Sequence, residues 1–462
     1  METIENPMGT RPLPQLLFSM AVPAVIANLV NSLYNIVDQI FIGHGIGYLG
    51  NAATSVAFPL TTVCMAFGLT CGLGGSANFN LALGRKEMDK ARHIVGTAVS
   101  MLLIIGITIC IFTNLFLEPL LVSFGATDRI LDYAIQYTRI TSFGIPFLML
   151  STGLNPLVRA DGSPTYSMTA IVLGAVLNTI LDPIFIFSFH WGIRGAAIAT
   201  LISQILSAVI LAAYLGRYKL VKLLKTDFIP KMEALKSIIS VGFSSFIFQA
   251  SLLIIQIVTN NMLKKYGAVS VYGSDVAIAI AGIVTKINAI FIAVIIGVVQ
   301  GAQPIVGYNY GAEKYDRVKG VVKLMLTVAA VISLIAFLIF ECFPKQLIAL
   351  FGTGSKLYFE FGIKYVRIFL FFTIFNGIQI ASTTFFQAIG KAAKGALLSL
   401  MKQIIFLLPL LMILPRFFGV FGVMYAAPVS DFIAFSASVT MLCMELKKMP
   451  QSINEKKERD IC

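Results

Sequence analysis

The sequence predicts an all-α polytopic membrane protein, with twelve transmembrane helices in two six-helix lobes that form a 6+6 parallel internal repeat. Hydrophobic residues make up 57% of the chain and charged residues 12%, where soluble domains carry roughly 25% charged residues. The mean hydropathy is +0.86. Apolar runs of about 20 residues recur along the whole chain, as membrane-spanning helices require. They are too long, and alternate too little, for transmembrane strands.

The apolar runs follow one another closely, which leaves no room for a soluble catalytic domain. A basic residue, Arg11, precedes the first run, but this run is too long for the core of a cleaved signal peptide and is expected to stay as a span. The predicted spans lie approximately at 15–42, 55–82, 94–117, 133–157, 166–189, 195–215, 238–263, 275–303, 321–343, 361–387, 395–415 and 420–445.

The basic residues of the loops lie mostly on one side of the predicted membrane. With the N-terminus on side one, this side collects 23 Lys and Arg residues and the other side collects 7. The positive-inside rule makes side one cytoplasmic, with both termini inside. The net charge of +13 is therefore a sign of topology, and no nucleic-acid partner is expected.

The chain contains an internal duplication. ALGRKEMDKARHIV (82–95) matches NYGAEKYDRVKGVV (309–322), Phe124-Gly125 matches Phe351-Gly352, and YTRI (137–140) matches YVRI (365–368). The offset between the members of each pair is the same to within a single position, which unrelated apolar sequences would not maintain. An even number of spans in each repeat gives both lobes the same orientation, with a central cleft between them. The predicted domains are a first lobe at 1–215, a basic cytoplasmic linker at 216–237, a second lobe at 238–446 and a charged cytoplasmic tail at 447–462.

The candidate charged side chains at membrane depth are Asp38, Asp182, Asp431 and Lys286. A charge near the bilayer centre costs roughly 2.5–3.5 kcal/mol, so such residues normally mark an ion site, a proton relay or a substrate pathway. The alternative is a structural pair satisfied within the protein. We expect the functional role most strongly for Asp38 and Asp182.

Polar residues around Asp38 and Asp182 share helical faces with them. In the first span an amide stripe ends at the carboxylate, and Tyr34 lies one turn before it. In the fifth span Asn178 and Asp182 are four residues apart, and Pro183 frees the carbonyl of Thr179. Such oxygen ligands suit a proton or a hard cation such as Na⁺. The stripe consists of Asn28, Asn31, Asn35 and Asp38.

The second half has no carboxylate in its first span, so the repeat is symmetric in fold but asymmetric in charge. We expect the first lobe to carry the coupling ion and the second to help form the substrate surface. The histidines are isolated and there is no phosphate-binding loop, so no metal site, no cofactor and no ATP-driven activity are expected. The substrate-cleft candidates are Asn31, Asn35, Gln249, Gln256, Asn260, Lys286, Asn376, Gln379 and Asp431.

Several motifs together resemble the MATE family of multidrug and toxic compound extrusion transporters. They are LYNIVDQIFIG (33–43), ALGRKEMDKAR (82–92), RADGSPTYSM (159–168), LNTILDPIFIF (177–187) and GAAIAT (195–200). QGAQPIVGYNYGAEKYDRV (300–318) and APVSDF (427–432) are similar to the MepA-like bacterial branch.

The resemblance implies a V-shaped pair of lobes that exports cationic amphipathic drugs or dyes from a bacterial cell by antiport with H⁺ or Na⁺. It implies a multi-pass monomer of the plasma membrane, and a role in antibiotic resistance. It also implies a bending proline at Pro23 on the first span, and a cation site formed by Tyr34, Asp38, Asn178, Asp182 and Thr200. Some relatives carry acidic residues on spans 7 and 10, where this chain has only amides. We therefore favour H⁺ over Na⁺.

Three other classes of protein are less consistent with the sequence. A lipid or polysaccharide-precursor flippase of related fold needs a strongly basic cleft, whereas the first lobe holds acidic candidates. Major-facilitator transporters also have 6+6 spans, but their loop after the second span resembles GxxxDRxGRR, and here it reads LGRKEMDKARH (83–93). An intramembrane enzyme would need paired acidic or histidine motifs with metal-ligand spacing.

Overall fold

The structure is a computed structural model that describes residues 6–351 and 355–450, and within these ranges every regular element is helical. The predicted tail beyond residue 450, and Gly352 of the repeat, lie outside the described residues. The first half contains η1 (Pro7–Gly9), α1 (Leu13–Gly45), α2 (Tyr48–Gly84), α3 (Met88–Leu115), α4 (Leu117–Ser123), α5 (Asp128–Ser142), α6 (Ile145–Ala160), α7 (Pro164–Pro183), η2 (Ile184–Ser188) and α8 (Gly192–Tyr214).

The second half begins after a linker with two short helical turns, η3 (Leu215–Arg217) and η4 (Lys225–Phe228). It contains α9 (Met232–Ala268), α10 (Ser274–Gly311), α11 (Tyr315–Cys342), α12 (Pro344–Ala349), α13 (Lys356–Phe369), α14 (Thr373–Ala388), α15 (Ala392–Leu400), η5 (Met401–Leu407), α16 (Leu408–Phe418) and α17 (Val420–Lys448).

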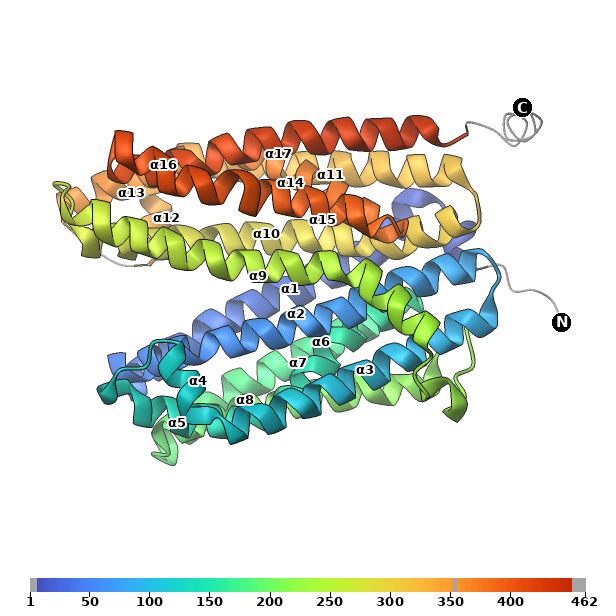
Figure 1. The fold of residues 1–462 in the computed structure, drawn as a ribbon, viewed down its shortest axis with the longest axis horizontal. Coiled ribbons are helices and arrows are strands. Elements are labelled where there is room, and N and C mark those ends of the chain that lie inside the picture. The colour runs from blue at the N-terminus through green and yellow to red at the C-terminus, as the bar shows by residue number, and fades with distance from the viewer. Residues whose placement is uncertain (1–5, 352–354, 451–462) are drawn as a thin grey trace.

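The helices form two bundles that lie one above the other in Figure 1. The lower bundle holds α1–α8 and the upper bundle α9–α17. The two ends of the chain lie at the same end of the molecule, on the right of the figure, as an even number of crossings requires. Each bundle buries its own large hydrophobic core, although the start of α1, including Leu17 and Met20, packs into the core of the upper bundle.

Most of the predicted spans are single helices. Among the described residues ten helices are long and apolar enough to cross a membrane, and the pair α13 and α14, bent by 45°, makes an eleventh. The predicted span 133–157 is divided into α5 and α6, which separate at Phe143 and Gly144. Pro146 explains this break, because a residue without a backbone N–H fits the first turn of a helix and not its interior.

The bounds of the helices repeat at the offset that the sequence predicts. α2 ends at Gly84 and α10 at Gly311, while α3 begins at Met88 and α11 at Tyr315. The distance along the chain from Gly84 to Gly311 is the same as that from Met88 to Tyr315. The division of α5 and α6 recurs in α13 and α14, in the register set by the YTRI and YVRI motifs. The breaks are therefore part of the repeated unit, and the predicted 6+6 repeat is confirmed.

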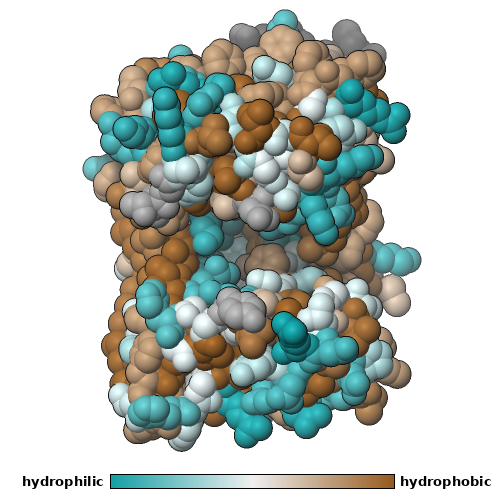
Figure 2. Space-filling model, turned by 90° about the vertical axis from the view of Figure 1, so that its left-hand side faces the viewer, coloured by the Kyte–Doolittle hydropathy of each residue, from teal (hydrophilic) through white to brown (hydrophobic). Residues whose placement is uncertain are grey.

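A hollow separates the two bundles at the end of the molecule away from the termini, and polar side chains lie around it (Figure 2). At the opposite end the bundles meet at backbone contact. A Cβ built on Gly84 would lie 2.2 Å from the carbonyl oxygen of Tyr308 in α10, and one on Gly242 would lie 2.0 Å from the carbonyl oxygen of Thr70 in α2. Only glycine fits at such distances, so the cleft is open at one end and closed at the other.

The linker is anchored to the first bundle by a buried carboxylate. Asp161 accepts hydrogen bonds from the backbone N–H groups of Lys219 and Leu220, at 2.6 and 2.9 Å, and from the hydroxyl of Tyr214 at 2.8 Å. A second carboxylate, Asp227 in η4, is fully buried and lies 2.9 Å from Nδ1 of His93 in α3. The linker therefore packs against the first bundle at both ends.

Candidate functional site

Six polar side chains from four helices of the first bundle lie close together near the ends of α1 and α7. Asp38 lies seven residues before the end of α1, about 10 Å along the helix axis. Asp182 lies one residue before the end of α7. The set consists of Tyr34 and Asp38 on α1, Tyr137 on α5, Asn178 and Asp182 on α7, and Thr200 on α8.

The two carboxyl groups are the centre of this cluster. The side chains of Asp38 and Asp182 lie within hydrogen-bonding distance of each other, and Nδ2 of Asn178 donates to Oδ1 of Asp182 at 3.3 Å. Two ionised carboxylates only accept hydrogen bonds and repel each other at this distance. The pair is therefore complete only with a proton or another cation between the oxygens.

Three oxygens of the cluster are buried without a hydrogen-bond partner. They are Oδ1 of Asp38, Oδ1 of Asn178 and Oδ2 of Asp182. Asp182 is fully buried and Asn178 is 2% exposed. A buried acceptor left unsatisfied costs roughly 1–3 kcal/mol, and several such acceptors at one place are the arrangement that a bound cation would satisfy.

The local sequence explains how α7 presents its carboxylate. Pro183 cannot donate to the carbonyl of the preceding turn, and the helix widens directly after it into the π-helical turn η2. Single π-helical turns within α-helices occur frequently at functional sites. The turn packs on the end of α1, where a Cβ on Gly45 would lie 2.2 Å from the side chain of Ile186.

Tyr137 belongs to the cluster, although the sequence analysis did not select it. Its side chain lies beside Thr200, and it is close enough to Asp38 and Asp182 for direct electrostatic interaction. The residue opens the YTRI motif of the internal repeat. An aromatic hydroxyl in a repeated motif at membrane depth could have identified it.

The amide stripe of α1 divides between two environments. Asn28 donates to Oε1 of Gln300 in α10 at 3.2 Å, and the same oxygen accepts from the buried Arg159 of α6 at 2.8 Å. This part of the stripe thus joins the two bundles. Asn35 is exposed and donates to the carbonyl of Asn31 within its own helix at 2.6 Å.

Pro23 lies inside α1, which runs as one helix from Leu13 through Gly45. Two turns of α10 pack closely beside it, because Cβ atoms on Gly297 and Gly301 would lie 2.5 Å from the Cα atoms of Val25 and Ala21. Bending of α1 at Pro23 stays a prediction.

The second bundle holds a separate polar cluster in which the charge is already paired. Nζ of Lys402 lies 3.0 Å from Oδ1 of Asp431 and donates to Oδ1 of Asn376 at 2.7 Å. Asn376 in turn donates to Oδ2 of Asp431 at 3.2 Å. Lys402 stands on the π-helical segment η5. Asp431, one of the predicted substrate-cleft residues, therefore already has a cation.

The other predicted cleft residues differ in exposure, and their role in substrate binding stays a prediction. Lys286 on α10 and Gln256 and Asn260 on α9 are exposed, Gln249 is half-buried, and Gln379 on α14 is 5% exposed. Within residues 6–351 and 355–450, no group of three or more His, Cys, Asp or Glu side chains is arranged to hold a metal ion.

Comparison with known proteins identifies the family. The sequence model described as MatE matches residues 23–184 and 246–413, which is more than half of the chain. The multidrug export protein MepA of Staphylococcus saprophyticus is 26% identical over 427 residues, covering 91% of this chain and 92% of that protein. MepA of Staphylococcus aureus is 26% identical over 436 residues, covering 93% and 94%.

The fold is also that of solved transporters. An outward-facing conformation of a multidrug resistance MATE family transporter of the MOP superfamily superposes with a TM-score of 0.90 at 24% identity, over 98% of this chain and 100% of that one. A MOP superfamily transporter from Pyrococcus furiosus, described as having a binding pocket of reversed polarity, gives the same TM-score, identity and coverage. These matches confirm the resemblance predicted from the motifs: the chain is a membrane transport protein of the MatE family.

Proposed function

We propose that this protein is a secondary active exporter of cationic amphipathic compounds, driven by H⁺ that enters through the Asp38–Asp182 site. The observation that carries the proposal is the contact between these two carboxyl groups, drawn from different helices and lacking a cation of their own. A site that must hold one proton or cation when closed, and can release it when the helices part, couples an ion gradient to lobe motion.

The arrangement of charge supports H⁺ as the coupling ion. The oxygens of the first bundle would also suit Na⁺. However, Asp431 of the second bundle is neutralised by Lys402, which leaves Asp38 and Asp182, among the predicted site residues, as the carboxyl groups that can bind the ion. A shared proton satisfies such a pair with no further ligand.

The cleft supports transport by alternating access. It opens at the end away from the termini (Figure 2), and the excess of basic loop residues places the termini in the cytoplasm. On this basis the structure faces outward, and the glycine contacts of α2 with α9 and α10 close the cytoplasmic end. We expect the two bundles to rock about this seam.

The relatives support the class of substrate and the location. The MepA proteins are named as multidrug export proteins of staphylococci. For this chain we accordingly propose lipophilic cations as substrates, a bacterial plasma membrane as the location and a monomer as the working unit. We propose transport without an enzymatic step.

The test is substrate-driven proton movement in proteoliposomes loaded with tetraphenylphosphonium, with and without Na⁺. We expect wild type to move protons in the absence of Na⁺ and Asp38→Asn to fail. Asp132→Asn, which alters an exposed carboxylate of α5, is the matched control and should behave as wild type. Equal proton movement by wild type and Asp38→Asn would overturn the role of the pair, and a strict requirement for Na⁺ would overturn H⁺ coupling.

A further inference from the structure

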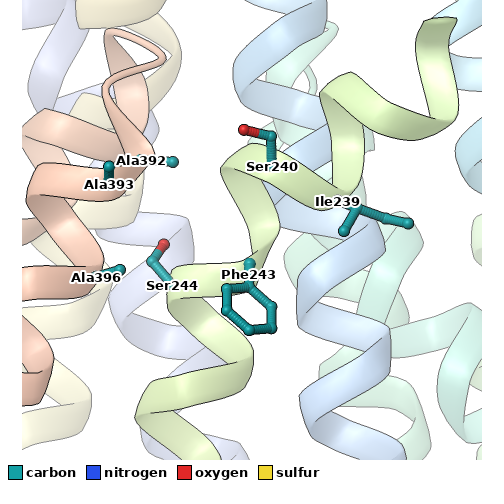
Figure 3. A pocket seen from close by; sticks show the side chains of 7 residues that line it. All are labelled: Ile239, Ser240, Phe243, Ser244, Ala392, Ala393 and Ala396. Carbon is teal, nitrogen blue, oxygen red and sulfur yellow. The ribbon is translucent and has the colours of Figure 1, made fainter.

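A groove of about 410 Å³ lies between α9 and α15, away from the carboxyl pair (Figure 3). Its walls are Ile239, Ser240, Phe243 and Ser244 of α9 and three alanines of α15. The size falls within the roughly 300–1,000 Å³ typical of ligand sites. The alanines leave the space open, since none of them reaches across to α9 in Figure 3.

The floor of the groove is closed by packing. Val241 of α9, Ala392 of α15 and Ala77 of α2 form a small buried cluster. Nε2 of Gln387 in α14 donates to the hydroxyl of Ser244 at 2.7 Å. The groove therefore does not lead on into the interior between the bundles.

The mouth of the groove opens toward lipid. Ile239 and Phe243 are one helical turn apart and are 41% and 51% exposed. Gly242, on another side of the same helix, touches α2. In a helix that spans the membrane, a large exposed apolar side chain meets acyl chains, so the groove is accessible from the bilayer.

A basic side chain stands at the end of the groove nearest the linker. Lys236 is exposed and lies one turn before Ser240 on the same face of α9. Lys391 directly precedes α15 and Lys394 lies in its first turn, but both form ion pairs with Glu445 of α17. Helical spacing places Lys394 on a different face of α15 from the three alanines, so Lys236 is the basic residue on the groove face.

The depths of these features match the two parts of a phospholipid. Lys236 lies four residues into α9, about 6 Å along the axis, and Ser240 to Ser244 lie about 12–18 Å along it. Lys236 is therefore at the level of headgroups and the groove is at the level of acyl chains. Basic pockets between helices on the cytoplasmic side are typical sites for anionic lipid headgroups.

We propose that the groove binds an anionic phospholipid of the leaflet on the side of the termini and the linker. One acyl chain fills the space between Phe243 and the alanines of α15, and the phosphate lies at Lys236. The positive charge of Lys236 at the mouth favours this occupant over a lipophilic cation. The site is independent of the proposed transport cycle and can be tested without transport.

The test uses a tryptophan placed in the groove and lipids that quench its fluorescence. Trp191, the single tryptophan of the chain, is replaced by Phe, and Phe243→Trp provides the reporter. The purified protein is reconstituted with dibrominated phosphatidylglycerol or, at the same molar fraction, dibrominated phosphatidylcholine. We expect stronger quenching by phosphatidylglycerol, with a preference that falls about fivefold in Lys236→Gln, the contribution of one lysine near an anionic surface.

A matched reporter separates the groove from the general lipid surface. Val331→Trp on α11, where the native side chain is 51% exposed, should be quenched equally by both lipids. Ile239→Trp serves as reporter if Phe243→Trp does not fold. Equal quenching by both lipids at the groove would overturn the proposal. Relief of the quenching by tetraphenylphosphonium would assign the groove to a cation and would overturn it as well.

Discussion

The closed end of the cleft depends on glycine at the seam between α2 and α10, and Gly311→Ala should open it. A Cβ on Gly311 would lie 2.4 Å from the carbonyl oxygen of Leu81. Ordinary contact begins at 3.4 Å, so the two backbones must separate by about 1 Å. Overpacking of this kind costs about 1–3 kcal/mol, and a bias of that size between two states shifts their ratio about 5- to 150-fold.

The assay is the distribution of distances between spin labels at Arg85→Cys and Asp316→Cys, two exposed positions beyond the ends of α2 and α10, in a background without the native cysteines. We expect Gly311→Ala to add a population at longer distances. Gly282→Ala is the matched control on the same helix, because its Cβ would meet nothing within 4 Å. If both variants keep the distribution of the parent protein, the seam does not hold the closed end.

Three further changes test the polar clusters and the linker. Asp431→Asn should destabilise the second bundle by about 3–5 kcal/mol because it leaves the charge of Lys402 unpaired. Thermal unfolding of the protein in detergent measures this loss. The double variant Lys402→Met/Asp431→Asn should recover most of the stability. Tyr137→Phe, which removes a hydroxyl beside Thr200 and the carboxyl pair, should weaken binding of the coupling ion by about 1 kcal/mol, seen as a roughly fivefold higher ion concentration for half-maximal transport; an unchanged value would contradict the assignment of Tyr137. Asp161→Ala should cost about 1–3 kcal/mol because two backbone N–H groups of the linker lose their acceptor, and cleavage of the linker by trypsin should become faster, whereas an unchanged rate would contradict the anchoring role.

The fold could be predicted from the sequence because membrane helices and a duplication leave patterns in one chain. Apolar length defines the spans, and the fixed offset pairs them. The break between α5 and α6 was missed because the apolar run continues through it, although Pro146 marks it. The break between α13 and α14 lies at Leu370 to Phe372, where no proline or glycine stands, and only its counterpart in the first repeat indicates it.

The site was predicted in part. A carboxylate at membrane depth carries a high free-energy cost, which points to a functional role. Asp38 and Asp182 could therefore be selected from the sequence alone. Tyr137 has only a weak signal in the sequence, its place at the start of the repeated YTRI motif, since an aromatic side chain costs little in a membrane and its role depends on which helices lie beside it. The pairing of Lys402 with Asp431 was also missed, because the two residues belong to different helices and their separation along the chain matches no helical spacing.

The two bundles differ in how their membrane carboxylates are neutralised, and this difference confines changes of charge to one bundle. The second bundle carries its own cation on Lys402, so its intramembrane charge is fixed by the covalent chain and cannot change during a cycle in which the pair stays intact. In the part of the first bundle that the structure describes, no basic side chain forms an ion pair with Asp38 or Asp182, so in the proposed mechanism the positive charge at this pair comes from the solution. Charge movement during a transport cycle would then come from the first bundle and the substrate. The second bundle, built from the same repeat, would contribute none.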